Sequence, residues 1–353
     1  MERVMASVRR VDEIIAIEGA DKIEVARIGG WRVVVKKGEF QEGSLAIYCE
    51  IDSFIPTEIA PFLTKSGHAP KEYNGVQGER LKTVKLKGQI SQGLLLPTKF
   101  LGAGPLEATI KHPTKDEHLV VFEGDDVSEY LGIQKWEPPV DAKLGGNPKG
   151  NFPNFIRKTD QERIQNLSRQ FADWNIKGET WEKTEKLHGS SMTVYVNEDA
   201  DGVCSRNIDL LPDEGNAYWD VAIRDSLHEI IRKNINRNIA IQGELCGPGI
   251  NGNTLKLKEL TFFVFDIFDI DAQQYLLPEE RHEIVRILGL RHVPVVGKNI
   301  HLGQVTVDDL LVDADGDSFV TPGVLREGYV YKSMHHHDPS FKVVSNKWLG
   351  KYE

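Results

Sequence analysis

Short runs in which hydrophobic and polar residues alternate, punctuated by glycine, fill the chain from Val4 to about Leu131. A period of two is typical of half-buried strands, and the glycines are typical of the turns between them. Many short strands of this kind predict a small β-barrel, closed or partly open. The expected strands are Ile23 to Ile28, Trp31 to Val35, Ser44 to Ile51, Leu81 to Leu86 and Gly93 to Leu96.

The pattern stops between Trp136 and Asn154, where the chain reads WEPPVDAKLGGNPKGNFPN. This stretch is rich in Pro, Gly and Asn and has almost no periodic hydrophobic positions, which is typical of a linker. We therefore expect a β-barrel module at residues 1–135, a linker at 136–154 and a second domain at 155–353.

Strand and helix patterns alternate in the second domain. Thr159 and Glu162 have the spacing of a capping box, and hydrophobic positions at 164, 167, 171 and 174 predict the helix that follows. The mixture predicts an α+β domain of antiparallel sheets flanked by helices. The other expected elements are strands at Met192 to Val196, Ile239 to Leu245, Phe262 to Ile270 and Gly328 to Lys332, and helices at Trp219 to Ile235 and Glu279 to Leu288, the last with Pro278 suited to its start.

Composition limits the classes of function. At 353 residues the chain exceeds the usual size of one domain. Its 43 Lys+Arg against 53 Asp+Glu give a net charge of −10, so any contact with nucleic acid must use a local basic surface. No run approaches the roughly 18 to 20 hydrophobic residues that span a bilayer, and no signal-peptide pattern is present. We expect a soluble, cytoplasmic protein with no membrane partner.

The three cysteines, Cys49, Cys204 and Cys246, lack the spacing of a zinc or redox motif. Each lies in a hydrophobic or strand-like run, so we expect inert core residues in a reducing compartment.

The segment TEKLHGSS places Lys186 just before a strand and a His-Gly step just after it. A single lysine of this kind is usually a solvated surface charge, so the assignment depends on partners elsewhere. These partners follow in order: Ser205-Arg206-Asn207, Gln242-Gly243-Glu244-Leu245, Phe265-Asp266-Ile267, Glu327 to Lys332, and Phe341-Lys342.

With these motifs in this order, the second domain resembles the covalent nucleotidyltransferases, the superfamily of ATP-dependent ligases and capping enzymes. Glu185-Lys186-Leu187-His188-Gly189 is similar to the RNA ligases, because K-x-H-G replaces the K-x-D-G of most DNA ligases. The stretch KTDQERIQN and an N-terminal barrel resemble the Deinococcus and Naegleria group. The resemblance implies an OB-like barrel followed by an ATP-grasp-like ligase domain.

The resemblance also implies the reaction. The enzyme would use ATP and Mg²⁺ or Mn²⁺ to join RNA ends or to seal nicks in RNA-containing duplexes. It would act in RNA repair as a monomer. Lys186 would carry AMP, with His188, Lys332 and Lys342 as further catalytic residues. The residues implied to bind the nucleotide are Glu185, Lys186, Gly189, Arg206, Glu244, Phe265, Lys332 and Lys342, and those implied to bind the metal are Glu327 and Glu244.

Each of these roles has a structural alternative. Glu244 would meet the ribose, and Glu327 would hold the metal or be only a turn residue. Phe265 would stack on adenine or be one more core aromatic side chain. Arg206 would bind the phosphate of the acceptor strand or form a surface ion pair.

A lysine with a pKa near its usual value of about 10.4 is a poor nucleophile at neutral pH. We therefore expect nearby positive charge, from Lys332, Lys342 and the metal, to lower the pKa of Lys186. The chain departs from the K-x-K pair of its relatives, because Val344 stands at the second lysine position. Lys347 or Lys332 would supply the missing charge.

The first module more weakly resembles OB-type tRNA-binding modules through ADKIEVARIGGWRVVV and VKLKGQISQGLLLP. Lys82, Lys85 and Lys87 would line a basic groove for a nucleic-acid backbone, or would be an ordinary solvated strand face.

Two other features are expected to carry no function. Asp313, Asp315 and Asp317 imitate the start of an EF-hand but lack its glycine and glutamate. His335 to His337 are expected to form a solvated loop. Two alternatives to an RNA ligase remain open, namely a DNA ligase and an RNA-binding protein with an inactive ligase domain.

Overall fold

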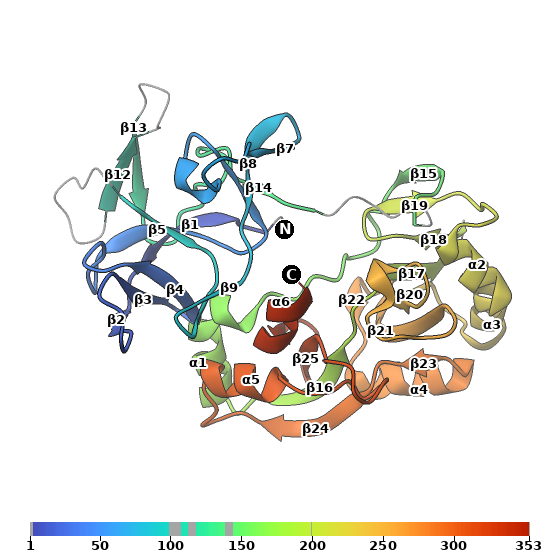
Figure 1. Ribbon diagram of the computed structural model, residues 1–353. Coiled ribbons are helices and arrows are strands. Elements are labelled where there is room, and N and C mark those ends of the chain that lie inside the picture. Colours follow the sequence, from blue (N-terminus) through green and yellow to red (C-terminus); the bar gives the residue numbers. More distant parts are fainter. Residues whose placement is uncertain (1–2, 99–106, 112–117, 138–143, 199, 353) are drawn as a thin grey trace. The chain divides into compact units, whose positions relative to one another are not determined.

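The computed structural model describes residues 3–98, 107–111, 118–137, 144–198 and 200–352. The chain divides into two compact units, one of residues 1–138 with 350–353 and the other of residues 139–349 (Figure 1). The division falls within the stretch 136–154. Residues Pro148–Asn151 of that stretch are not linker but form strand β15 of the second unit.

Short antiparallel strands make up the first unit, and a hydrophobic core packs among several of them. The alternation of Trp31–Lys36 is realised in β4, where Trp31, Val33 and Val35 are buried and the residues between them are more exposed. The sheets have the orders β1(Ala6–Arg10)-β5(Leu45–Cys49)-β11(Leu94–Pro97), β2(Glu13–Ala16)-β3(Ile23–Ile28)-β4 and β14(Gln134–Lys135)-β6(Ser53–Pro56)-β8(Val76–Arg80)-β7(Lys71–Tyr73), with a further pair β12(Glu107–Lys111)-β13(His118–Phe122).

The expected strand from Leu81 to Leu86 is wrong. Strand β8 ends at Arg80, and Val84–Leu86 (β9) pairs with Gln89–Ser91 (β10) in a separate hairpin. Lys87 and Gly88, with φ of 47° and 81°, form the tight turn of this hairpin. Positive φ at both central residues matches the twist of paired strands, so the turn folds the run back on itself.

Two antiparallel sheets form the second unit (Figure 1). The larger has the order β15-β19(Ile208–Leu210)-β18(Asp201–Cys204)-β17(Ser190–Val196)-β20(Ile239–Cys246)-β21(Thr261–Asp269)-β22(Gln274–Tyr275), and β23(Arg291–His292) pairs with β21 in parallel. The smaller has the order β24(Val295–His301)-β16(Thr180–Lys186)-β25(Gly328–Ser333)-β26(Ser340–Val344). The expected α+β class, with an OB-like barrel and a ligase domain of antiparallel sheets, is confirmed.

Helices cover both sheets of this unit. Helices α2 (Ala217–Arg224), α3 (Leu227–Asn234) and α4 (Pro278–Leu288) pack on the larger sheet, and α1 (Ser168–Ile176) and α5 (Val307–Ala314) pack on the smaller one. Helix α4 begins at Pro278 as expected and ends at Gly289, whose φ is 65°. Helix α6 (Asn346–Tyr352) and the short 3₁₀ turns Pro61–Leu63, Ile164–Asn166 and Asn251–Asn253 complete the described elements.

Two helix predictions are corrected. The helix expected from Trp219 to Ile235 is two helices, because Ser226 adopts a left-handed conformation with φ of 49°. The helix expected after Thr159 begins only at Ser168. Glu162 forms no capping box, because the segment before the helix runs along β26, where the Lys342 N–H donates to the Glu162 carbonyl. Pairing with the sheet outweighs the local capping preference.

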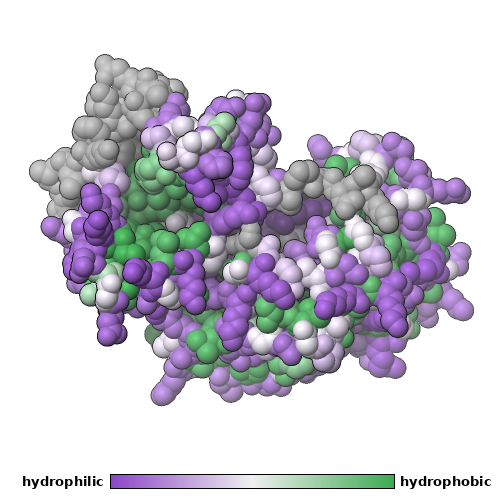
Figure 2. Space-filling view, viewed as in Figure 1, coloured by the Kyte–Doolittle hydropathy of each residue, from purple (hydrophilic) through white to green (hydrophobic). Residues whose placement is uncertain are grey.

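The surface is mainly polar in the view of Figure 2, with hydrophobic residues in small groups. Among the described residues, no helix is both long and apolar enough to cross a membrane. Cys49, Cys204 and Cys246 are buried and free, and burial raises the pKa of each thiol, that of Cys49 to about 12.

Candidate active site

Lys186 is the last residue of β16, and its Nζ lies 2.7 Å from Oε1 of Glu327. The pairing of Lys186 with Gly328 on β25 sets this contact, because Glu327 directly precedes Gly328. Gly328 is required here, since a Cβ would lie 2.0 Å from the Val343 carbonyl oxygen. Strand register therefore brings together two residues 141 positions apart, which the motif pattern had assigned to one site.

The predicted depression of the Lys186 pKa is wrong for the protein alone. Burial lowers this pKa, but the carboxylates of Glu327 and Glu244 outweigh burial and raise it. The lysine is thus held as an ammonium ion against Glu327. A cation that drew Glu327 away from it would release the amine for attack.

Glu244 on β20 faces the same position. Its Oε1 accepts a hydrogen bond of 2.9 Å from the Gly189 N–H. A Cβ on Gly189 would lie 2.3 Å from the Leu245 carbonyl oxygen, so only glycine fits between the strands. Burial, reinforced by Glu327 and opposed by Lys186, raises the pKa of Glu244 to about 7. Because the neighbouring Glu327 carboxylate contributes to this rise, the pair forms a site that gains from a cation.

The carboxylates also fit a divalent metal. Oε2 of Glu327 is buried and has no hydrogen-bond partner, and it lies 3.8 Å from Nδ1 of His188. Among the described residues no group of three His, Cys, Asp or Glu side chains could hold a metal. Mg²⁺ commonly uses one or two carboxylates and completes its shell with water and substrate phosphates. Glu327 and Glu244 suit that mode of binding and not a closed protein cage.

His188 lies between Glu327 and helix α6. Its ring packs edge-on against Trp348 with centroids 4.7 Å apart. Burial lowers the pKa of His188, Glu327 opposes this, and Lys186 lowers it further. The neutral imidazole is therefore favoured beside Lys186.

Lys332 lies at the opposite end of the small sheet. It pairs with Glu182, four residues before Lys186 and thus about 13 Å away along the strand. Its Nζ lies 2.6 Å from Oδ2 of Asp266 and donates to the Phe265 carbonyl at 2.6 Å. Lys332 is thus too distant to lower the Lys186 pKa by contact, contrary to expectation. Its ammonium also lies 5.6 Å from the centre of the Phe265 ring.

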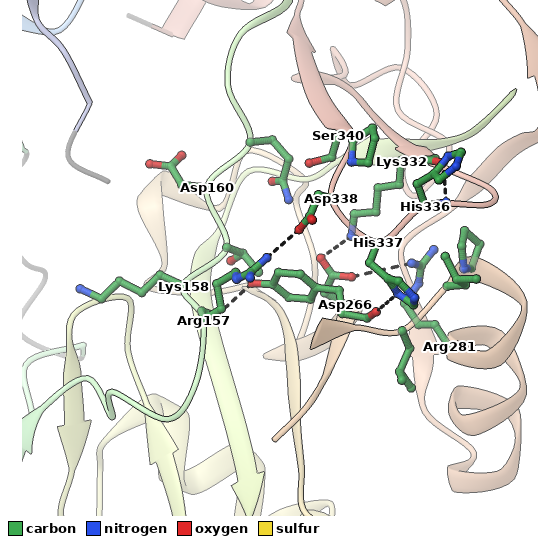
Figure 3. A pocket seen from close by; sticks show the side chains of 18 residues that line it. Arg157, Lys158, Asp160, Asp266, Arg281, Lys332, His336, His337, Asp338 and Ser340 are labelled. Atoms are coloured by element: carbon green, nitrogen blue, oxygen red, sulfur yellow. Dashed lines mark hydrogen bonds and ion pairs between the residues drawn. The ribbon is translucent and has the colours of Figure 1, made fainter. Parts of the chain in front are cut away.

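A buried ionic chain surrounds Lys332. Asp266 lies 3.7 Å from Nη1 of Arg281, and Arg281 and His282 both contact Glu182. Burial lowers the pKa of Lys332 to about 8, Asp266 opposes this, and Arg281 lowers it further. Figure 3 shows Lys332, Asp266 and Arg281 beside a cavity of about 190 Å³. Other lining residues shown there are Arg157, Lys158, Asp160, His336, His337, Asp338 and Ser340.

Lys342 and Arg206 share one carboxylate. Nζ of Lys342 lies 3.3 Å from Oδ1 of Asp160, and Nη2 of Arg206 lies 3.1 Å from its Oδ2. Lys342 pairs with Val330 on β25, between the positions of Lys186 and Lys332. The structure thus brings together two predicted phosphate-binding cations from distant motifs.

Glu185 lies apart from the other predicted residues. Successive side chains of a strand point to opposite faces, so the Glu185 carboxylate is on the other side of β16 from Lys186. It is 1% exposed, and its Oε2 accepts a 2.9 Å hydrogen bond from the Phe319 N–H. The structure therefore does not bring this carboxylate to the position of Lys186.

The two lysines expected to supply the charge missing at Val344 each have an acidic partner, Asp315 for Lys347 and Asp266 for Lys332. Val344 is buried, and Nζ of Lys347 lies 3.8 Å from Asp315. Arg163 is the cation that lowers the Lys186 pKa. Sequence reasoning missed its role, although Arg163 lies in the quoted stretch KTDQERIQN and bridges to Lys342 on β26.

The histidine triplet makes local contacts. Nδ1 of His336 lies 2.9 Å from Oε2 of Glu179, and Nδ1 of His337 lies 2.6 Å from the Tyr275 carbonyl. His336 is 65% exposed, so its contact does not bury it.

Comparison with known proteins agrees with this arrangement. An OB-fold domain model matches residues 5–98, and an RNA ligase model matches residues 179–344. No curated protein matches the chain.

Solved structures of the Naegleria gruberi RNA ligase are similar over nearly the whole chain. A mutant without ligand is 43% identical with a TM-score of 0.87, covering 99% of this chain and 98% of that one. A mutant solved with ATP and Mn is 42% identical with a TM-score of 0.86, and the enzyme solved with PPi is 42% identical with a TM-score of 0.87; both cover 99% of each chain. Together with the motifs gathered around Lys186, this similarity shows that the chain belongs to the RNA ligase family.

Proposed function

We propose that Lys186 carries AMP in this ATP-dependent RNA ligase and that the enzyme repairs RNA by sealing 3′-hydroxyl to 5′-phosphate ends. The observation that carries this assignment is the contact between Lys186 and Glu327, with a second, unpartnered Glu327 oxygen beside it. The Lys186 amine would attack the α-phosphorus of ATP, and the Glu327 oxygen without a hydrogen-bond partner would be available to bind the metal on the phosphates.

In the first step, the lone pair of Lys186 Nζ attacks the α-phosphorus of ATP. The bond from that phosphorus to the bridging oxygen breaks, pyrophosphate leaves, and the nitrogen loses its proton. Mg²⁺ or Mn²⁺, held by Glu327 and Glu244, would neutralise charge on the phosphates. Arg163 and Lys342 would add positive charge from this chain, since stabilising the developing charge is the main task in phosphoryl transfer.

The base would lie toward the other end of the sheet. Phe265 offers a ring face there, and Lys332 contacts the Phe265 carbonyl. At this end of the sheet, Lys332 would hold Phe265 and Asp266 in place through its contacts with them. Lys342 would instead bind an ATP phosphate. Glu244, whose carboxylate accepts from the Gly189 N–H, would meet the ribose as well as the metal.

Two further steps complete the reaction. A 5′-phosphate oxygen of the RNA attacks the AMP phosphorus, the bond to Lys186 breaks, and AppRNA forms. The 3′-hydroxyl then attacks the 5′-phosphate, its proton is lost, and AMP leaves. Arg206 would bind the RNA phosphate in these steps; it is half exposed and reaches Asp160 from the edge of the site.

The first unit would hold RNA and do no chemistry. Lys82, Lys85 and Lys87 are exposed on and beside the hairpin of β9 and β10. Because the whole chain has a net charge of −10, such a local basic surface is where a polyanion would bind. We also expect the enzyme to act as a monomer in the cytoplasm.

Labelling with α-labelled ATP tests the central assignment. Wild-type protein with Mn²⁺ should become covalently labelled, and Lys186→Ala should not. Labelling of the alanine variant would refute Lys186 as the nucleophile, and equal labelling by GTP would refute ATP specificity. A panel of nicked duplexes with RNA or DNA on each side would then define the substrate; sealing that requires no RNA 3′-hydroxyl end would favour a DNA ligase.

A further inference from the structure

Arg326 directly precedes the proposed metal-binding residue Glu327, and it is 5% exposed. Its guanidinium donates to four backbone carbonyls at the end of α5 and in the loop that follows it. Nε donates to Ala314 at 3.2 Å, Nη1 to Asp317 at 2.9 Å, and Nη2 to Asp313 at 3.1 Å and Asp315 at 2.9 Å. The loop that imitates the start of an EF-hand thus folds around an arginine of the chain itself.

The carboxylates of this loop point to other partners. Asp313 pairs with Lys183, Asp317 accepts from the Gly323 N–H, and Asp315 accepts from Ser345. Among the described residues, no carboxylate lies within ion-pair distance of Arg326. Backbone carbonyls and the Tyr329 ring, 4.2 Å from the guanidinium carbon, therefore stabilise this buried charge.

Gly316 lets the backbone approach the guanidinium. Its φ is 143°, and a Cβ at this position would lie 2.9 Å from Nη2 of Arg326. The glycine and the arginine therefore depend on each other.

A closed ring of contacts links Arg326 to Glu327. Arg326 holds the Asp315 carbonyl, and the Asp315 carboxylate accepts a 2.7 Å hydrogen bond from the Ser345 hydroxyl. The Ser345 N–H donates to the Glu327 carbonyl at 2.8 Å, which closes the ring through the peptide bond between Arg326 and Glu327. The ring fixes the backbone from which the Glu327 carboxylate extends.

The same loop is also linked to residues on both sides of Lys186 in the sequence, His188 and Glu185. Ser345 caps α6 by accepting from the Trp348 N–H at 3.1 Å, and the Trp348 ring packs on His188. On the other face of β16, the Phe319 N–H binds the Glu185 carboxylate. Contacts of Glu327, His188 and Glu185 thus all trace back to one loop.

We propose that Arg326 is a positioning residue for the metal site: it serves as the internal cation that organises loop 313–319 and thereby aims Glu327 and His188 at the reaction centre. The proposal rests on the assignment of Glu327 as a metal ligand made above. A lysine could not replace Arg326, because the planar guanidinium offers five N–H donors in a fixed fork and an ammonium cannot span four carbonyls in this way.

The test measures metal affinity directly as well as activity. Mn²⁺ is titrated into full-length protein with a non-hydrolysable ATP analogue, and free Mn²⁺ is read by electron paramagnetic resonance. The half-saturating Mn²⁺ concentration for labelling by α-labelled ATP is measured in parallel. Variants are Arg326→Lys, Gly316→Ala and Glu327→Ala, with Arg237→Gln as a matched control. Arg237 pairs with Asp269 and Glu280 and makes none of the contacts above.

Arg326→Lys and Gly316→Ala should both weaken Mn²⁺ binding by about 10- to 100-fold, the usual cost of removing support for a metal ligand. Labelling should recover at high Mn²⁺ to within a few-fold of wild type, which general unfolding would not allow, and Arg237→Gln should change neither readout. Gly316→Ala keeps the arginine, so the result does not depend on how well Arg326→Lys folds.

The outcomes separate the two proposals. If Glu327→Ala weakens Mn²⁺ binding but Arg326→Lys and Gly316→Ala do not, the positioning role is refuted and the metal role stands. If Glu327→Ala binds Mn²⁺ like wild type, the metal assignment fails. If Arg326→Lys and Gly316→Ala lose labelling at every Mn²⁺ concentration while binding Mn²⁺ normally, the loop acts on another part of the site and the proposal is overturned.

Discussion

Two lysines on one face of the small sheet, Lys186 and Lys332, lie in opposite electrostatic environments. Both are largely buried, with side chains 26% and 11% exposed. The pKa of Lys186 is raised, whereas that of Lys332 is lowered to about 8. In both cases burial acts in the same direction, so the difference comes from the neighbouring charges.

The neighbours differ in their balance of charge. Lys186 faces two carboxylates, Glu327 and Glu244, whereas Lys332 faces Asp266 with Arg281 behind it. The two acids at Lys186 are also the proposed metal ligands, so the environment that protects the amine can change when ATP and metal arrive. The acid at Lys332 is held in a buried ionic chain and has no such freedom. We infer that Lys186 acts as the nucleophile and that Lys332 positions neighbouring residues.

Arginine substitutions test this contrast most strongly. Lys186→Arg keeps the charge but cannot form the bond to AMP at neutral pH, so labelling should be lost completely. Lys332→Arg keeps the charge that contacts Asp266 and should slow labelling by less than about 10²-fold, the usual lower cost of removing one such electrostatic group. Initial labelling rates at saturating ATP give the comparison. Complete loss in both variants would contradict the division of roles.

The two cations on Asp160 sharpen the comparison, because one of them, Lys342, pairs with β25 between the positions of the two lysines. Lys342→Ala should slow labelling by about 10² to 10³-fold, since it would neutralise ATP phosphate. Arg206→Ala should label normally and seal poorly. Pre-adenylylated 5′-AppRNA isolates the last step and shows whether Arg206 acts on RNA. Equal loss of labelling in both variants would show that Asp160 joins them into one functional unit.

Much of this site follows from the sequence. Motif order identified Lys186, Glu327, Lys342 and Arg206. The structure gathers the first three because β16, β25 and β26 are neighbours, and Arg206 joins them through its contact with Asp160. The position of Glu185, on the face away from Lys186, follows from strand β16, which the sequence pattern did not predict. The sign of the Lys186 pKa shift was not readable, because it depends on distances across strands.

Other misses have local causes. The break at Ser226 leaves little trace in a helical pattern, because a single left-handed residue costs only about 1–2 kcal/mol and packing can supply it. The run from Leu81 to Leu86 looked like one strand because the turn at Lys87 and Gly88 comes after it. The segment from Asp313 to Asp317 was expected to carry no function, because it lacks the glycine and glutamate of an EF-hand. Sequence alone does not show that the guanidinium of Arg326 binds the backbone carbonyls of this segment.

Substitutions in the basic hairpin of the first unit should not change the labelling reaction in which Lys186 and Lys332 take part. Changing Lys82, Lys85 and Lys87 to Ser should spare labelling but weaken RNA binding and sealing, most strongly at low salt, where phosphate contacts contribute most to affinity. Each lost phosphate contact should reduce the slope of log affinity against log salt by about 1. The matched control changes the exposed Lys22, Lys36 and Lys37 to Ser. If both triple variants lower the slope equally, binding reflects the charge of the unit and not the hairpin.

The smallest expected effect is on the free energy of unfolding. It tests Lys332 separately from Lys186, because the measurement needs no substrate. The folded pKa of Lys332 is about 8, below the unfolded value of about 10.4. Between these pH values the unfolded chain binds more protons than the folded one, so the free energy of unfolding should rise with pH. Urea unfolding of wild type and Lys332→Met from pH 7 to 10.5 measures this, because the methionine variant lacks the group. The difference in stability, wild type minus variant, should increase through that window. Asp266→Asn removes the carboxylate that opposes the effect of burial, so it should start the rise at a lower pH. A difference that stays flat from pH 7 to 10.5 would show that Lys332 keeps an ordinary pKa and that its buried ionic chain does not set it apart from Lys186.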